Sequence, residues 1–243
     1  MKWFSLRTFP IEGKTVLVRV DYNVPIENVK IMDRTRIRAS VPTIQFLLEN
    51  NCKIVLMSHL GNGEEPFDEV AKEVEKLLGR KVMKLDECIG KEVREAVAAA
   101  QQGEVILLEN LRMHKQEKEN NAAFAHALAD LADVYVNDAF ATCHRKHASI
   151  DAITQFLPAI AGIWLERELT QLQHVLKPER PTVWIIGGAK LEKIQLVEKA
   201  LQKADYVLVG GVLPFAFMKA KGIPIGNSLT NEKTVATAKR ILR

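Results

Sequence analysis

Short runs of apolar residues recur along the chain, and each is followed by a loop and then by a stretch with helical periodicity. The runs predict strands at Val16–Val20, Ile54–Met57, Val82–Lys84, Glu104–Leu108, Val134–Asn137, Thr182–Ile186 and Tyr206–Val209. The stretches between them predict helices at Pro42–Glu49, Phe67–Leu78, Lys91–Gln101, Asn121–Leu131, Ile163–Leu176, Leu191–Lys203 and Leu213–Lys221. Because strands alternate with helices, and most strands are apolar throughout, the pattern predicts an α/β protein. Its mostly parallel sheet is expected to carry helices on both faces.

One domain boundary is visible in this pattern. The helix predicted at Ile163–Leu176 is followed by Pro178 and Pro181, which cannot continue it, and a new strand begins directly after them. We therefore expect residues 1–177 to form one domain that the long helix closes, and residues 178–243 to begin a second. With only two predicted strands, the second part is too short to enclose an ordinary core.

Composition narrows the class of protein. The 243 residues are 47% hydrophobic and 26% charged, as is usual for globular proteins, and 34 Lys and Arg against 30 Asp and Glu leave a net charge of only +4. This mild excess does not require nucleic acid as a partner. There is no run of 18 apolar residues and no signal-peptide pattern at the start, and Cys52, Cys88 and Cys143 lie too far apart for a zinc knuckle. A cytoplasmic protein with no membrane partner is expected.

Polar side chains follow four of the predicted strands. In chain order they are Asp21, Asn23, Arg36, Arg38, His59, Arg112, His144, Arg145, Lys146 and His147, with Arg36 and Arg38 expected just ahead of a helix. Because ligands of parallel α/β sheets bind at the carboxyl ends of the strands, these groups are expected along one edge. Arginine pairs with phosphate or carboxylate through two hydrogen bonds. Each loop alone could be an ordinary basic surface, but together they predict a site for a small polyanion.

The second part carries two glycine pairs, each directly after a predicted strand. Gly187 and Gly188 precede a helix with Lys190 and Lys193, and Gly210 and Gly211 precede the next helix. Glycines let backbone N–H groups approach an anion, although a tight turn needs them equally. The two lysines are expected to share a helix face, where they could reach a phosphate or be solvated.

These loops together resemble phosphoglycerate kinase. The resemblance runs through nearly the whole chain in the motifs RVDYNVP, TRIRASVPTI, MSHLG, VILLENLRMH, YVNDAFATCHRKHAS, LPAIAGIWLEREL, IIGGAKLEKI and GGVLPFAFMKAKG. It implies two doubly wound parallel α/β domains, joined by a helix and brought together by hinge closure, of which this chain contains the first and the beginning of the second. It also implies reversible phosphoryl transfer between 1,3-bisphosphoglycerate and ADP, giving 3-phosphoglycerate and ATP. Mg²⁺ would be bound with the nucleotide.

The resemblance also implies a role for individual residues. Asp21 and Asn23 would hold the glycerate, and His59, Arg112 and Arg145 would bind its 3-phosphate. The resemblance assigns phosphoryl transfer and nucleotide binding to Arg36, Lys193, Gly187, Gly188, Lys190, Gly210 and Gly211. Since the attacking carboxylate is already ionised at pH 7, no general base is needed. The protein then has to position the two substrates and neutralise the charge of the phosphoryl group during transfer.

The sequence departs from the family pattern at a few places. Asn62 replaces the usual phosphate-binding arginine, Val212 replaces a glycine, and Lys193 follows Lys190 by three residues instead of four. Family members continue for several more strands and helices, whereas this chain ends at Arg243. We therefore expect low turnover by this chain alone. The alternatives are a truncated, non-catalytic polyanion-binding module and one subunit of a split enzyme with a complementary C-terminal half chain.

Overall fold

The computed structural model describes residues 3–243, which form two compact units, one ending at Leu169 and one running from Thr170 to Arg243. The division falls inside the helix α6 (Ile163–Leu176), whereas the sequence pattern placed it after that helix. One contact of the end of α6 with the second unit is a 3.3 Å hydrogen bond that Lys203 Nζ donates to the Leu176 carbonyl.

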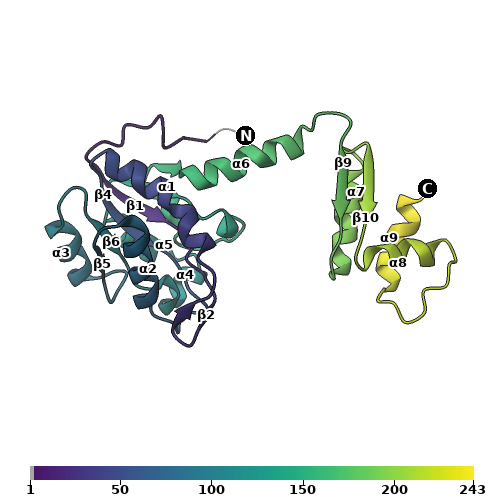
Figure 1. Ribbon diagram of the computed structural model, residues 1–243, viewed down its shortest axis with the longest axis horizontal. Helices are drawn as coiled ribbons and strands as arrows, with labels where there is room; N and C mark the ends of the chain where they lie inside the picture. Colours follow the sequence, from purple (N-terminus) through teal and green to yellow (C-terminus); the bar gives the residue numbers. More distant parts are fainter. Residues whose placement is uncertain (1–2) are drawn as a thin grey trace. The chain divides into compact units, whose positions relative to one another are not determined.

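The first unit is built on a six-stranded parallel sheet in the order β5-β6-β4-β1-β7-β8 (Figure 1). Its strands are β1 (Thr15–Arg19), β4 (Lys53–Met57), β5 (Val82–Lys84), β6 (Val105–Leu107), β7 (Val134–Asn137) and β8 (Ala159–Ala161). This confirms the α/β class with a doubly wound parallel sheet. The sequence pattern missed β8 because its three residues, Ala159–Ala161, form no long apolar run.

Helices cover both faces of this sheet. They are α1 (Thr35–Glu49), α2 (Asp68–Leu78), α3 (Lys91–Ala99), the single turn α4 (Lys115–Lys118) and α5 (Ala122–Ala129). Alternate residues of β1 enter different cores: Val18 packs with Ile44 of α1 on one face, and Leu17 packs with Val97 of α3 and Phe124 of α5 on the other. Burial of both faces explains why these strands are apolar at every position.

The helix α1 begins earlier than the sequence pattern predicted. It starts at Thr35 and carries Pro42 inside it, so Arg36 and Arg38 lie in its first turn and not ahead of it. Proline at the start of a helix is common, which favoured Pro42 as the beginning. The structure tolerates an internal proline here because one stripe of α1 is buried over its whole length, at Ile37, Ser40, Thr43, Ile44 and Leu47.

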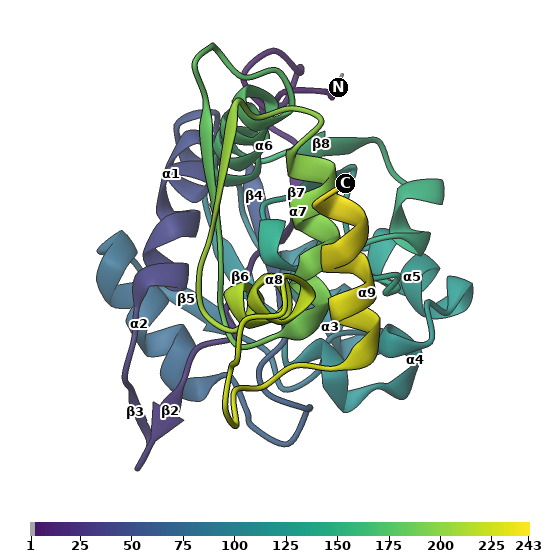
Figure 2. The ribbon, with the colours of Figure 1, turned by 90° about the vertical axis from the view of Figure 1, so that its right-hand side faces the viewer.

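Short segments complete the first unit. Single 3₁₀ turns lie at Leu111–Met113, Phe140–Thr142 and Ala152–Gln155. An antiparallel pair, β2 (Ile26–Glu27) with β3 (Lys30–Ile31), extends beside α2 (Figure 2). In the described residues, no helix is long and apolar enough to cross a membrane.

The second unit contains two parallel strands and three helices. They are β9 (Val183–Ile186), α7 (Ile194–Ala200), β10 (Tyr206–Val209), α8 (Leu213–Ala220) and α9 (Glu232–Ile241). A small core joins Ile194, Val197, Leu213, Ala216 and Ala238 with the inner side chains of the strands. The outer side chains of the strands remain exposed: Val183 by 52%, Ile185 by 78%, Tyr206 by 64% and Leu208 by 55%. This sheet therefore has one covered face and one bare apolar face.

Candidate functional site

The centre of the first sheet is a topological switch point. β1 pairs with β4 on one side and with β7 on the other, and the chain leaves β1 and β7 in opposite directions. Such a point opens a crevice at the carboxyl ends of the strands, where ligands of this architecture bind. The loops after β1, β4, β6 and β7 supply the polar residues that the sequence singled out.

Asp21 and Asn23 organise the loop after β1. Asp21 Oδ2 accepts a hydrogen bond from Arg36 NH1 at 3.0 Å, and Asp21 Oδ1 accepts one from the Asn23 backbone N–H at 3.2 Å. The Asn23 side-chain oxygen in turn accepts a 3.0 Å hydrogen bond from the Gly61 N–H. These contacts connect the loops after β1 and β4 with the first turn of α1.

His59 follows β4 and contacts a fully buried arginine that the sequence analysis missed. Arg19, the last residue of β1, places NH2 3.0 Å from His59 Nδ1 and donates through Nε to Ser149 Oγ at 2.9 Å. A charged residue at the end of an otherwise apolar strand was the signal that could have identified it. Burial, followed by the charges of Arg19 and Arg112, lowers the pKa of His59 to about 2, so its imidazole is neutral.

Arg112 leaves one buried donor without a partner. Its NH1 donates to the Gly61 carbonyl, whereas its buried Nε–H has no hydrogen-bond partner. Burial, followed by the nearby charge of Arg145, lowers the pKa of Arg112. A buried, unsatisfied guanidinium N–H beside other cations is the environment that an anionic ligand would relieve.

The loop after β7 supplies Arg145, which is half-buried and lies close enough to affect the pKa values of both His59 and Arg112. His144 and Lys146 on either side of it are exposed. His147 lies 3.6 Å from the buried carboxylate of Glu117. The loop therefore alternates between side chains that face the solvent and side chains that face the protein.

Asn62 is exposed in the loop after β4 and forms no side-chain hydrogen bond within the described residues. Its backbone carbonyl accepts a long hydrogen bond of 3.5 Å from Lys118 Nζ. The loop therefore lacks an arginine at this position, but it has a lysine at its edge.

A cavity of about 200 Å³ lies beside this site in the first unit, lined by Asp21, Arg36, Asp138, Trp164 and Glu168 among others. Asp138 is 3% exposed, and its Oδ1 accepts the backbone N–H groups of Trp164 and Leu165 at the start of α6. Its Oδ2 has no partner, and burial raises the pKa of Asp138 to about 6.

The two glycine turns of the second unit lie side by side. A Cβ on Gly187 would meet the Gly210 carbonyl carbon at 3.2 Å, and a Cβ on Gly211 would lie 2.3 Å from the Gly188 oxygen. Gly188 and Gly211 also have φ values of +121° and +60°, which favour glycine. The turns therefore require Gly188 and Gly211 for their own conformation and close packing, whereas Gly210 has room for a Cβ and donates its N–H to the Ile186 carbonyl at 2.9 Å.

The two lysines of the second unit do not share a helix face, contrary to the sequence-based expectation. Lys190 is extended and exposed before the 3₁₀ turn Leu191–Lys193, because the helical turn begins one residue after it. Lys193 ends that turn, and its Nζ donates to the Gly187 carbonyl at 2.9 Å. Lys193 is thus held against the glycine turns, whereas Lys190 is not.

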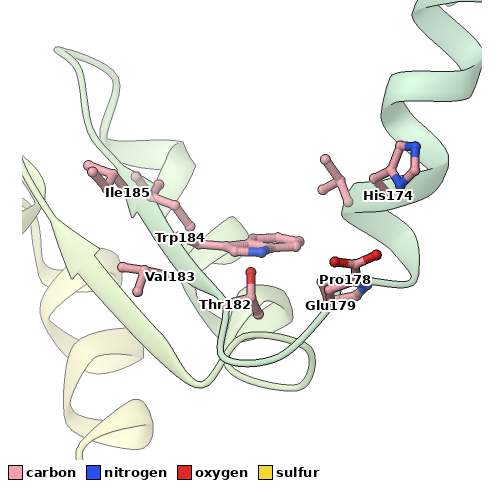
Figure 3. A pocket seen from close by; sticks show the side chains of 9 residues that line it. His174, Pro178, Glu179, Thr182, Val183, Trp184 and Ile185 are labelled. Atoms are coloured by element: carbon pink, nitrogen blue, oxygen red, sulfur yellow. The ribbon is translucent and has the colours of Figure 1, made fainter.

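A cavity of about 550 Å³ lies elsewhere in the second unit, between the end of α6 and β9 (Figure 3). Trp184 extends across it toward Pro178 and Glu179. Its other walls are mostly aliphatic, and it contains none of the candidate binding or catalytic residues named from the sequence. We assign no chemistry to it.

One group of side chains in the described residues could hold a metal ion. Ligand atoms of Glu87, Cys88 and His114 lie within 4.8 Å of one another. Burial raises the pKa of the Cys88 thiol, which opposes formation of the thiolate that metal binding needs. His114 Nε2 already contacts Glu87 Oε2 at 2.9 Å, so a direct contact between these two side chains accounts for their proximity.

Comparison with known proteins identifies relatives along the whole chain. The model of the phosphoglycerate kinase family matches residues 6–243. The phosphoglycerate kinase of Moorella thermoacetica is 47% identical over 251 residues, which cover 100% of this chain and 64% of that protein. The phosphoglycerate kinase of Dictyoglomus turgidum is 44% identical over 245 residues, which cover 98% of this chain and 62% of that protein.

Solved structures agree with these relatives. The phosphoglycerate kinase from Coxiella burnetii superposes with a TM-score of 0.89 at 34% identity, over 99% of this chain and 63% of that one. The phosphoglycerate kinase from Pyrococcus horikoshii has a TM-score of 0.83 at 33% identity, over 98% of this chain and 62% of that one. The chain thus spans between 62% and 64% of the length of the proteins it matches here.

Proposed function

The chain belongs to the phosphoglycerate kinase family, and on that premise we propose that its first unit binds 3-phosphoglycerate or 1,3-bisphosphoglycerate. The observation that carries this proposal is the buried Arg112 Nε–H without a partner, with Arg145 close to it. A phosphate group would satisfy this donor and neutralise the cations around it. Asp21 and Asn23, one loop away, would hold the hydroxyl and carboxyl end of the glycerate.

The reaction proposed is reversible phosphoryl transfer between 1,3-bisphosphoglycerate and ADP. In the reverse direction, a carboxylate oxygen of 3-phosphoglycerate attacks the γ-phosphorus of ATP, and the bond from that phosphorus to the ADP oxygen breaks. No proton moves, which suits a site without a catalytic base. Arg36 would stabilise the phosphoryl group from the first unit, and Lys193 would do so from the second.

The nucleotide is assigned to the glycine turns of the second unit. Backbone N–H groups at Gly187, Gly188 and Gly211, with the Lys193 ammonium, would suit phosphate oxygens, whereas the Gly210 N–H already donates to the Ile186 carbonyl and Gly210 would only shape the turn. These donors do not suit a metal ion, so Mg²⁺ would arrive bound to the nucleotide phosphates, where it neutralises their charge. Lys190 would contribute only as an exposed cation near the phosphates.

We expect turnover by this chain alone to be low. It spans less than two thirds of the length of its relatives, and its second sheet has only two strands in the described residues. Binding without transfer would make it a phosphoglycerate-binding module. The presence of Arg36, which a plain binder needs less, favours the kinase.

Calorimetric titration with 3-phosphoglycerate tests the binding proposal. Arg145→Ala should weaken binding by about tenfold or more, because it removes a charge-assisted contact. Arg94→Ala removes an exposed arginine from α3 and is the matched control, for which affinity should not change. No binding to folded wild-type protein, or equal loss in both variants, would refute the proposal.

A second candidate, one subunit of a split enzyme, rests on the bare apolar face of the second sheet. Val183, Ile185, Tyr206 and Leu208 all present more than half of their surface to solvent on that face. The test mixes this chain with the part of the Moorella thermoacetica relative that this chain does not span. A 1:1 complex in sedimentation, with turnover that neither chain shows alone, supports the split enzyme. Two chains that sediment separately after mixing exclude it.

The compartment proposed is the cytoplasm. All three cysteines are free, two of them buried, as is usual in a reducing compartment. Small-molecule substrates are the partners expected, with no role for nucleic acid or membrane.

A further inference from the structure

We propose that Arg19 is a positioning residue that holds His59 as a neutral imidazole with its proton on Nε2, so that His59 donates an uncharged hydrogen bond to the phosphate. The role of the phosphate rests on the proposed function, whereas the position of the proton does not.

The argument begins at the contact between the two side chains. Arg19 NH2 lies 3.0 Å from His59 Nδ1, and both groups are almost completely buried. A guanidinium has five N–H donors and no acceptor, and it stays protonated in proteins. Arg19 must therefore be the donor and His59 Nδ1 the acceptor. A neutral imidazole that accepts at Nδ1 carries its proton on Nε2.

The other side of Arg19 is held by a second set of hydrogen bonds. Arg19 Nε donates to Ser149 Oγ at 2.9 Å, and Ser149 Oγ donates to Glu117 Oε1 at 2.6 Å. The Ser149 backbone N–H donates to the other oxygen of Glu117 at 2.9 Å. Arg19 thus donates at both ends of this chain, to His59 Nδ1 on one side and to Ser149 Oγ on the other, and these contacts hold the guanidinium in place.

His59 Nε2 is the end of this chain that remains available. Within the described residues it has no hydrogen-bond partner, and it is not among the buried atoms that lack one. Burial, followed by the charges of Arg19, Arg112 and Arg145, keeps the pKa of His59 far below the usual range, and the titratable His147 beside them has its own pKa lowered by burial. Protonation of His59 would add a cation to an already crowded cationic site. The neutral Nε2–H gives a directed donor without that cost.

Nitrogen NMR of the histidine side chains in the ligand-free protein tests the proton position. His59 is assigned from the signal lost in His59→Gln, and exposed His126 serves as the reference. We expect pure Nε2–H at His59 from pH 5 to 8. Arg19→Met should introduce the Nδ1–H form. Nδ1–H in the wild type, or an unchanged tautomer in Arg19→Met, would overturn the proposal.

Binding of 3-phosphoglycerate tests the consequence through a double-mutant cycle. In His59→Gln, the side-chain amide keeps an N–H donor near Nε2 whose orientation does not depend on Arg19. Loss of the Arg19 charge weakens binding in both backgrounds, so this part of the effect cancels when the two losses of affinity are compared. We expect Arg19→Met to cost about tenfold more in the His59 background than in the His59→Gln background. Equal losses in the two backgrounds would show that Arg19 does not act through His59.

If Arg19→Met does not fold, Ser149→Ala carries the same two measurements. It keeps the arginine, whose NH1 still donates to the Val20 carbonyl and Ser58 Oγ, but removes the acceptor of its Nε–H, and we expect a smaller share of the Nδ1–H form than in Arg19→Met. If His59 shows the expected Nε2–H tautomer but the protein does not bind 3-phosphoglycerate, the proposed function is refuted. The positioning of His59 by Arg19 would then still stand.

Discussion

Asp138 and Trp164 join the loop after β7 to the start of α6 through a 2.9 Å hydrogen bond, which Asp138 Oδ1 accepts from the Trp164 backbone N–H. Gly162 allows this approach, because a Cβ there would lie 2.3 Å from Asp138 Oδ1. The other carboxylate oxygen, Oδ2, is buried without a partner. The carboxyl group thus caps a helix at the expense of one unsatisfied oxygen.

The stability of the first unit should therefore depend on the protonation of Asp138. Burial raises its pKa in the folded protein to about 6, against about 3.9 for an unfolded aspartate. A raised folded pKa means that the folded state binds the proton more tightly. The resulting stabilisation is complete below about pH 3.9 and is lost as the pH rises through 6, by about 2–3 kcal/mol in all.

Asp138→Asn checks this sign. The amide keeps the Oδ1 acceptor and has no proton to lose between pH 4 and 7, so its stability relative to the wild type should rise by about 2–3 kcal/mol over that range. Denaturant unfolding at each pH measures the difference. Asp86→Asn, at an exposed carboxyl group, is the control and should show no such trend. A constant difference between Asp138→Asn and wild type would contradict the prediction.

The glycine turns of the second unit provide a matched pair of substitutions. Gly211→Ala should destabilise the protein by more than about 1–2 kcal/mol, because φ is +60° and the new Cβ would lie 2.3 Å from the Gly188 oxygen. A Cβ on Gly210 would have no atom within 4 Å to meet, so Gly210→Ala should be nearly neutral. Thermal unfolding compares the two variants, and equal melting temperatures would contradict the prediction.

The elements of this fold were largely predictable from periodicity, since strands buried on both faces are apolar and their helices are amphipathic. The errors arose where a local rule gave way to tertiary packing. Pro42 lies inside α1 because the buried stripe of the helix extends to Ile37 on its N-terminal side. Lys190 is extended because the helical turn begins only at Leu191, and spacing alone does not show where a helix starts.

The site was predictable only at its surface. Sequence placed Arg112 and Arg145 at one edge of the sheet because the carboxyl ends of parallel strands meet there. The support beneath them was not visible, because Arg19, Ser149 and Glu117 come from three distant segments whose hydrogen bonds exist only in the folded chain. A buried network of this kind has no local pattern in the sequence.

Restoring an arginine at position 62 should strengthen phosphoglycerate binding. Asn62 is exposed in the loop that contacts Arg112 through Gly61, and the resemblance places an arginine there. Asn62→Arg should tighten binding by about tenfold through one added charge-assisted contact. Calorimetry measures this change. Asn62→Gln, of similar polarity but without charge, should bind as the wild type does.

Lys118 offers a related prediction, because its Nζ lies 3.5 Å from the Asn62 carbonyl and brings a cation to the same loop. If it replaces part of the missing charge, Lys118→Ala should weaken binding in the wild type by a few-fold and have less effect in Asn62→Arg. The same calorimetric titrations compare the two backgrounds. Equal effects of Lys118→Ala in both would show that the lysine acts independently of position 62.

Arg36 should matter for ligand binding and transfer but little for folding. Its ion pair with Asp21 has a 3.0 Å N–O distance, yet the Arg36 side chain is 47% exposed, and solvent-exposed pairs contribute only about 0–1 kcal/mol. Arg36→Ala should therefore leave the unfolding free energy within about 1 kcal/mol of the wild type. It should weaken 3-phosphoglycerate binding less than Arg145→Ala does, because Arg36 is held by Asp21, whereas Arg145 lies with Arg112 and His59. Denaturant unfolding and calorimetry on the same samples separate the two effects. A large loss of stability in Arg36→Ala would show that the arginine has a structural role, and a loss of binding as large as in Arg145→Ala would place it in the phosphate site.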